Sequence, residues 1–218
     1  MKPFIIAFCA TGIALLAGCA TSPTTRSGPY SVVAYKPKNP DNVRVKVSLS
    51  KQNVYVMEGD KVLLAAATCI GEPTHRTPSG NFRITGKIPT KRSGEYGFRV
   101  QGGNIVPAQV SASIPGTYVG YPMAWWCEFS PGYGFHQGFV WPVPRTHGCL
   151  RLHKAVAPKF FALVKDGTPV NIAETQPEDA TVTVPRPQDY RDPDPPASYL
   201  TSSSVFEKPA GELLVAQP

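Results

Sequence analysis

A cysteine and two histidines stand close together in the apolar segment GFHQGFVWPVPRTHGCLRL, residues 134–152. A free thiol is only slightly ionised at neutral pH, but a neighbouring histidine can take its proton and leave the more nucleophilic thiolate. Cys149 has two such neighbours in the sequence, His136 and His147. Because residues two apart share a face of an extended segment, His147 and Cys149 are expected to line one pocket. The pattern therefore predicts covalent catalysis by a cysteine.

Two other interpretations of this segment stay open on the residues alone. A histidine on an aromatic strand and a buried cysteine usually serve only packing. By residue type, a zinc ion is a further candidate occupant, with the ligands His136, His147, Cys149 and His153. Residue types by themselves do not separate these interpretations from catalysis.

The residues around Cys149 add the other groups that attack on a carbonyl carbon requires. Gly148 frees the backbone to turn. The amides of Gly148 and Cys149 are then candidates for donating hydrogen bonds to a developing oxyanion. Arg145 and Arg151 bracket the motif and are suited to holding a carboxylate.

Mostly β-strands must position these residues. Apolar and polar side chains alternate over VRVKVSL, which is typical of a half-buried strand at residues 43–49. Further strands are expected at residues 53–70 (a hairpin), 81–88, 117–129, 134–141 and 168–173. The one expected helix covers residues 154–164, with Pro158 tolerated in its first turn. The polar, Gly-rich residues 89–116 are predicted to form a long loop or lid, and such loops are often functional.

Together with the upstream GFHQG, the run RTHGCLRL resembles the L,D-transpeptidase catalytic domain family, the YkuD-like cysteine enzymes of bacterial cell-wall synthesis. Their signature is a histidine, a variable gap, then Ser or Thr followed by His-Gly-Cys and, two residues later, Arg or Asn. Here it reads His136, nine intervening residues and residues 146–151. A Thr-Pro-x-Gly-x-Phe segment at 77–82 and the run KDGTPVNI at 165–172 are also similar, so the resemblance spans about residues 42–174.

The resemblance implies a mostly β fold, an L,D-transpeptidase-like β-sandwich or barrel with one short helix after the catalytic cysteine. It implies Cys149 as the nucleophile and His136 as the general acid and base. The family forms a thioester with one peptide stem of peptidoglycan and expels a terminal D-amino acid, after which an amine of a second stem attacks. The implied partners are peptidoglycan stem peptides; no metal, cofactor or nucleic acid is implied.

The resemblance also assigns supporting residues. His147 and Gly148 would support the pocket and the oxyanion, and Thr146 and Arg151 would contact substrate. The gap between His136 and Thr146 is shorter than in several members of the family. The lid over the site is therefore expected to differ, and with it the preference for donor and acceptor.

Other function classes fit the residues less well. A sortase-like transpeptidase also uses His, Cys and Arg, but its histidine lies much further upstream and it lacks the His-Gly-Cys run. Papain-like peptidases place the cysteine before the histidine, which is the opposite order. The alternatives that remain are a catalytically idle, peptidoglycan-binding envelope lipoprotein and an L,D-carboxypeptidase or hydrolase on the same fold.

The N-terminal residues resemble the signal of a bacterial lipoprotein. Lys2 precedes an apolar run over residues 3–18 that is too short for a comfortable membrane span. The run ends in LAGC, which resembles a lipobox and implies cleavage after residue 18 and lipidation of Cys19. Several acyl chains anchor a protein stably. Ala20 after the cysteine favours the outer membrane, with the chain on its periplasmic side.

The predicted organisation is a signal peptide (1–18), a flexible tether (19–41), a catalytic domain (42–174) and a Pro-rich, disordered tail (175–218). The formal net charge of +7 suits an anionic partner such as a cell-envelope polymer, lipid headgroups or nucleic acid, and it also fits a role in solubility alone.

Three cysteines would remain in the mature chain besides the lipidated one, namely Cys69, Cys127 and Cys149. In an oxidising compartment an odd number leaves at least one thiol free. Both a Cys69–Cys127 disulfide and two inert buried thiols fit the sequence.

Overall fold

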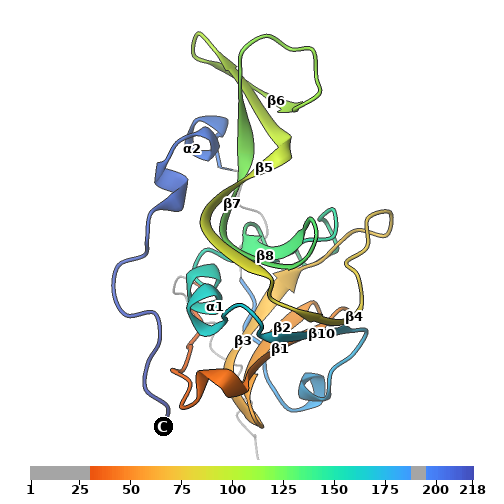
Figure 1. Ribbon diagram of the computed structural model, residues 1–218, viewed down its shortest axis with the longest axis vertical. Coiled ribbons are helices and arrows are strands. Elements are labelled where there is room, and N and C mark those ends of the chain that lie inside the picture. Colours follow the sequence, from red (N-terminus) through yellow and green to blue (C-terminus); the bar gives the residue numbers. More distant parts are fainter. Residues whose placement is uncertain (1–29, 188–194) are drawn as a thin grey trace, which may run out of the picture.

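The computed structural model describes residues 30–187 and 195–218 (Figure 1). The predicted signal peptide, the predicted lipidation site Cys19 and the first part of the predicted tether lie outside the described residues. Within the described ranges, no helix has both the length and the apolar character of a membrane span.

The strands that the structure describes form one mixed sheet in the order β4-β10-β1-β2-β3-β9-β8-β7-β5-β6. Their bounds are β1 Val43–Ser48, β2 Asn53–Glu58, β3 Lys61–Cys69, β4 Gly80–Arg83, β5 Gly86–Gln101, β6 Asn104–Gln109, β7 Thr117–Ser130, β8 Tyr133–Gln137, β9 Leu150–Leu152 and β10 Pro169–Ala173. The helices are α1 Ala157–Leu163 and α2 Ala197–Thr201, with 3-10 turns η1 Pro40–Asn42, η2 Pro177–Ala180 and η3 Ser204–Phe206. The pairs β1–β10 and β8–β9 are parallel, and the other pairs are antiparallel.

One segment of chain joins the two ends of this sheet. β4 pairs with β10, and β5, which follows directly, pairs with β7. Between them the Ile84 amide donates to the Thr168 carbonyl at 2.9 Å, and the Thr85 amide donates to the Glu128 carbonyl at 2.8 Å. The sheet therefore curls around its own core, and the predicted mostly β, sandwich-or-barrel architecture is confirmed.

The core lies inside this curled sheet, with α1 packed against it. β1 alternates buried valines with the half-exposed Arg44 and Lys46, as its sequence predicts. α1 places Phe160 against Phe135 of β8, with ring centroids 4.5 Å apart. Pro158 lies in the first turn of α1, where its missing amide removes no helical hydrogen bond. The predicted helix after the cysteine is thus confirmed.

The prediction of a long loop or lid at residues 89–116 is wrong. β5 and β6, together with the first half of β7, form a twisted ribbon of residues 89–122 that projects from the curled sheet (Figure 1); we call it the arm. Gly102 and Gly103 have φ values of 56° and 86°, as a two-residue hairpin turn requires. The arm lies beyond the core, so apolar alternation, the signal that reveals a strand in a sequence, is weak there: Val106 is 41% exposed.

The tail is also more regular than predicted. Residues 175–187 and 195–218 include η2, α2 and η3, and Leu200 and Val205 are buried. Arg92 of the arm donates to the carbonyls of Leu200 (2.9 Å) and Ser202 (2.7 Å) and lies 4.8 Å above the Phe206 ring. Prolines exclude long elements but not single helical turns, so composition alone did not reveal this docking.

Replacing Arg92 by glutamine is expected to release the segment 195–207 from the arm. Hydrogen bonds from a charged donor each contribute about 1.5–3 kcal/mol, so the loss of several weakens docking substantially. Hydrogen exchange of the amides in this segment is expected to accelerate at least about tenfold. Arg99→Gln, a change of the same type elsewhere in the arm, is the control and is expected to leave the exchange of these amides unchanged. Unchanged protection of these amides in Arg92→Gln protein would contradict this account.

Cys69 and Cys127 are free and buried, so of the two arrangements that the sequence allowed the structure has inert thiols. Burial raises the pKa of Cys127 to about 12 and also raises the pKa of Cys69. Neither thiol is therefore ionised at neutral pH, and neither is accessible to a substrate.

Candidate active site

The site lies where β8 and β9 run parallel. Phe135 pairs with Leu150, and His136 pairs with Arg151. Phe135 and Leu150 are fully buried in the core, so the alternating positions of both strands point to the opposite face. Cys149, two residues before Arg151, is on that face with Arg151 and His136. The sequence did not predict β9, because three residues between a turn and a loop carry no periodic signal.

A tight turn of residues 146–149, which we call the cysteine turn, presents Cys149. The Thr146 hydroxyl donates to the Cys149 carbonyl at 2.6 Å and accepts from the Gly148 amide at 3.1 Å. Gly148 has φ +102°, and a Cβ there would lie 2.4 Å from the Tyr133 ring, so the position requires glycine. The turn is therefore locked from inside by one hydroxyl and one glycine.

These hydrogen bonds change two roles that the sequence predicted. Thr146 is only 1% exposed and its hydroxyl is fully engaged, so it positions the turn rather than contacting substrate. The Gly148 amide donates to Thr146, which is at odds with its predicted role as an oxyanion donor. The amide of Cys149 remains the candidate for that role.

Replacing Thr146 by valine is expected to lower the rate at which Cys149 is acylated by about 10- to 100-fold, because a misplaced reacting atom costs rates of this order. Thr146→Ser keeps the hydroxyl and is expected to retain most of the rate. The measurement is the rate at which a carbapenem forms a covalent adduct with Cys149. Thermal melting of both variants is the control for folding. Equal rates in the two variants would show that the hydroxyl does not set the turn.

His136 is held as a neutral imidazole. It is 5% exposed, and its Nδ1 lies 2.8 Å from the Gln137 carbonyl. Because a carbonyl oxygen only accepts, Nδ1 carries the proton and Nε2 is the acceptor. Burial, reinforced by the positive charge of Arg151, lowers the pKa of His136 to about 4. His136 can therefore accept a proton over a wide range of pH.

Cys149 is a neutral thiol at rest. Its Sγ donates to the Gly132 carbonyl at 3.7 Å. Burial raises the pKa of Cys149, and the Gly134 amide and the charges of Arg151 and Lys91 offset this only in part. A resting thiolate–imidazolium pair, which the sequence led us to expect, would need the opposite shifts on both groups. A neutral thiol and a neutral imidazole instead fit a reaction in which the proton moves during attack.

His147 belongs to a second group of side chains. Its ring lies 4.5 Å from that of His75 and meets Tyr96 of the arm edge-on at 4.9 Å. Its Nε2 is 3.9 Å from a carboxylate oxygen of Glu72. The expectation that His147 and Cys149 share a face rested on an extended backbone, and the positive φ of Gly148 removes that basis.

The alternative zinc set of the sequence is not assembled. His153 accepts from the Ala155 amide through Nδ1 at 3.1 Å, and its ring packs edge-on against Tyr30. His153 and His147 thus have separate surroundings. Of the two arginines, Arg145 lies over the Trp141 ring at 4.4 Å and is exposed, whereas Arg151 shares the face of Cys149.

Lys91 is a site residue that the sequence did not reveal. It lies on β5, 4.8 Å above the ring of Trp126, which is 6.1 Å from the ring of His136. Its charge is close enough to lower the pKa of Cys149. Lys91 stands in the polar segment read as a loop, so only the pairing of β5 with β7 reveals that it reaches the site.

Comparison with known proteins gives one family and several distant structures. The model of the L,D-transpeptidase catalytic domain family, YkuD, matches residues 42–172. An L,D-transpeptidase from Stackebrandtia nassauensis is 18% identical with a TM-score of 0.46, and the alignment covers 71% of this chain and 63% of that one. L,D-transpeptidase 1 of Mycobacterium tuberculosis is 20% identical with a TM-score of 0.44, and the alignment covers 61% of each chain.

The chain thus spans less than two thirds of the length of these two structures. Among curated proteins, none matches the sequence.

Proposed function

The chain belongs to the L,D-transpeptidase catalytic domain family, and from this premise we propose that it is a cysteine acyltransferase acting on the stem peptides of peptidoglycan. The observation that carries the proposal is the face that β8 and β9 share, where His136 pairs with Arg151 and Cys149 directly precedes β9. The confirmed resemblance supplies the reaction class, and this face supplies the groups for it.

In the first step, Nε2 of His136 takes the proton of Cys149 as Sγ attacks a carbonyl carbon of the donor stem. The carbonyl becomes an oxyanion, for which the Cys149 amide is the proposed donor. Collapse breaks the bond to the terminal D-amino acid, and His136 returns the proton to the leaving amine. The donor acyl group is then held as a thioester on Cys149.

In the second step, an amine of an acceptor stem attacks the thioester carbonyl. His136 takes a proton from this amine, the C–S bond breaks as the Cys149 thiolate leaves, and His136 returns the proton to the sulfur. A thioester suits this path because it persists long enough to meet an amine and still reacts readily. Water in place of the amine would give the hydrolase alternative.

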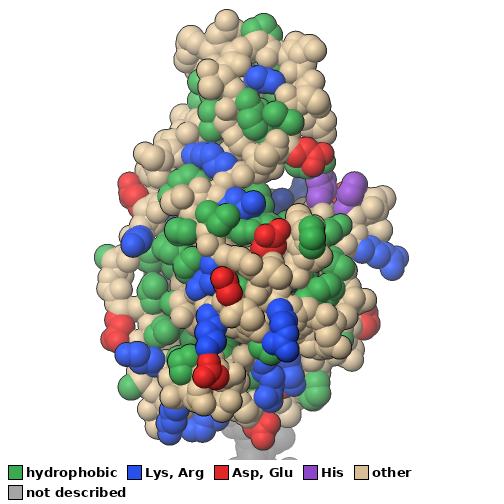
Figure 2. All heavy atoms as spheres, in the orientation of Figure 1, with side chains coloured by type: hydrophobic (Ala, Val, Ile, Leu, Met, Phe, Trp, Pro, Cys, Tyr) green, Lys and Arg blue, Asp and Glu red, His purple; other side chains and the backbone are tan. Residues whose placement is uncertain are grey.

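Two positive charges beside the sulfur support a carboxylate-bearing donor. Arg151 and Lys91 each lower the pKa of Cys149, so both charges act at the sulfur. Carboxylates of a stem peptide would be held by hydrogen bonds from these cations. Several Lys and Arg side chains also lie on the face of the lower body that Figure 2 shows, interspersed with acidic ones, in keeping with the net charge of +7.

We further propose that the chain is a lipoprotein, anchored through Cys19 on the periplasmic side of the outer membrane. The basis is the run ending in LAGC and Ala20 after it. Mass spectrometry of the mature N-terminus tests this directly. An unmodified first residue other than Cys19 would refute it.

The function itself is tested with purified protein and a disaccharide tetrapeptide, with and without an added D-amino acid or acceptor stem. Release of the terminal D-amino acid together with a new amide product is the expected result. Release without any amide product would identify a hydrolase. No release would favour the idle, peptidoglycan-binding alternative.

A further inference from the structure

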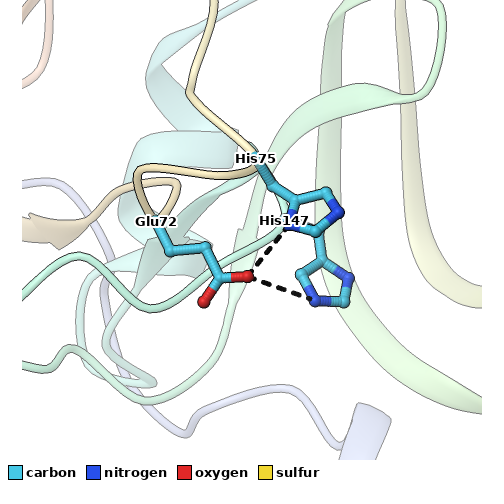
Figure 3. A group of neighbouring side chains, drawn as sticks. All are labelled: Glu72, His75 and His147. Carbon is cyan, nitrogen blue, oxygen red and sulfur yellow. Dashed lines mark hydrogen bonds and ion pairs between the residues drawn. The ribbon is translucent and has the colours of Figure 1, made fainter.

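We propose that Glu72, His75 and His147 form a binding site for a divalent metal ion of the zinc type, distinct from the thiol of Cys149. Figure 3 shows the three side chains converging, with both imidazole rings on one side of the carboxylate. Glu72 and His75 come from the loop of residues 71–77, and His147 comes from the cysteine turn. We call these three residues the His-Glu cluster.

The separations between ligand atoms in the His-Glu cluster are close to those between ligands of one bound zinc ion. Its ligand atoms all lie within 4.8 Å of one another. Oε1 of Glu72 is 2.9 Å from Nδ1 of His75 and 3.9 Å from Nε2 of His147. Ligands on a tetrahedral zinc ion stand about 3.3 Å apart, because each bond is about 2.0–2.1 Å long. These two distances lie on either side of this value and the separation of the two histidine ligand atoms is at most 4.8 Å, so side-chain shifts of up to about 1.5 Å would complete the site.

The backbone under the His-Glu cluster is fixed. The Glu72 amide donates to the Thr146 carbonyl at 2.9 Å, which ties the loop to the cysteine turn. The His75 amide donates to the Glu72 carbonyl at 2.9 Å, and the Gly71 amide donates to the Thr77 hydroxyl at 2.9 Å. A Cβ at Gly71 would lie 2.1 Å from the His75 carbonyl, so the loop is closely packed. The backbone that carries the ligands is therefore held in place without an ion.

Neighbouring groups orient the ligands. The Thr74 hydroxyl donates to Glu72 Oε1 at 3.1 Å, a contact typical of the outer shell of a metal site. Tyr96 of the arm packs edge-on against the His147 ring. These contacts restrict the carboxylate and one imidazole to the converging arrangement.

The chemistry of the ligands selects the class of ion. Two imidazoles and one carboxylate suit zinc and similar borderline ions better than magnesium or calcium, which prefer oxygen. The side chains of His75 and His147 are each 51% exposed and that of Glu72 is 36% exposed. Histidine side chains also reach the surface where the arm meets the body in Figure 2. An ion thus has access from solvent and a coordination position open to water or an anion.

The test is equilibrium binding of Zn²⁺ to the full chain by competition with a chromophoric chelator. Tetrahedral coordination is read separately from the visible absorption of bound Co²⁺. Wild-type protein is expected to bind one ion per chain. Glu72→Gln and His75→Asn are expected to weaken binding at least about tenfold, since each removes a ligand.

Two control variants test whether residues outside the His-Glu cluster bind the ion. Cys149→Ala must keep wild-type affinity, because the thiol is not part of the His-Glu cluster. His153→Asn must also keep it; asparagine can still accept from the Ala155 amide, so the fold is preserved. Thermal melting without metal checks that every variant is folded.

The proposal fails if folded wild-type protein binds no ion. It fails equally if Cys149→Ala removes binding while His75→Asn leaves it intact, because the thiol would then be the ligand. Metal binding in Cys149→Ala protein does not depend on catalysis, so this result stands apart from the fate of the proposed function.

Discussion

Cys149→Ala protein is expected to form no covalent adduct with a carbapenem, whereas the wild type is expected to gain the mass of one molecule per chain. Cys149 is the one cysteine among the described residues that is not buried, and it lies on the face of His136 and Arg151. A carbapenem carries a reactive carbonyl and a carboxylate, the two features that the proposed reaction requires of a donor. Intact-mass spectrometry and peptide mapping measure the adduct.

Cys69→Ala is the matched control for this experiment. Cys69 is fully buried and burial raises its pKa, so its loss is expected to leave the adduct on Cys149 unchanged. Thermal melting of both variants shows whether each is folded. An undiminished adduct in Cys149→Ala protein would overturn the nucleophile assignment.

Strands that line the core were predictable from the sequence. β1 alternates because one of its faces packs inward and the other meets solvent. The arm was missed for the converse reason: Tyr96 and Val106 are both exposed, because this part of β5 and β6 projects beyond the core. Docking of the tail through Arg92 depends on carbonyls more than a hundred residues away, and no local pattern encodes it.

The site was predictable in its residues but less so in its geometry. The motif in the sequence joins His136 to Cys149, and the structure brings the two close because β8, which carries His136, pairs with β9, which follows Cys149. The role of His147 did not follow, because one positive φ at Gly148 decides which way the neighbouring side chains point. Lys91 reaches the site only through the sheet, so no spacing in the sequence could reveal it.

The protonation states of the two reacting groups lead to a mechanistic distinction. Burial lowers the pKa of His136 to about 4 and raises that of Cys149. With His136 neutral and Cys149 protonated, no reactive thiolate is present between turnovers. Such a site becomes nucleophilic only when a carbonyl is in place to be attacked, which limits oxidation of the sulfur.

His136→Asn is expected to lower the rate of acylation at pH 7 by about a thousandfold, within the range that general base catalysis contributes. Asparagine keeps a polar group near the Gln137 carbonyl but cannot take a proton from Cys149. The measurement is the second-order rate of carbapenem adduct formation. Thermal melting of the variant checks that it is folded, and Cys149→Ala gives the background.

The pH dependence of this rate separates a general base from a mere packing residue. His136 acts as a base only when neutral, so the wild-type rate should hold between pH 7.5 and 5.5 and fall only as the pH approaches about 4. A histidine with the ordinary pKa of about 6.5 would lose about tenfold over that interval.

In His136→Asn protein the attacking species is the thiolate alone. Its rate should therefore rise about tenfold per pH unit up to the raised pKa of Cys149. The lowered pKa of His136 also means that the wild-type fold loses stability as the pH falls below about 6.5 and through about 4, because the unfolded chain binds the proton more tightly. Melting curves at each pH therefore accompany the rates. A wild-type profile that rises in parallel with that of His136→Asn would mean that His136 packs beside the thiol without taking its proton.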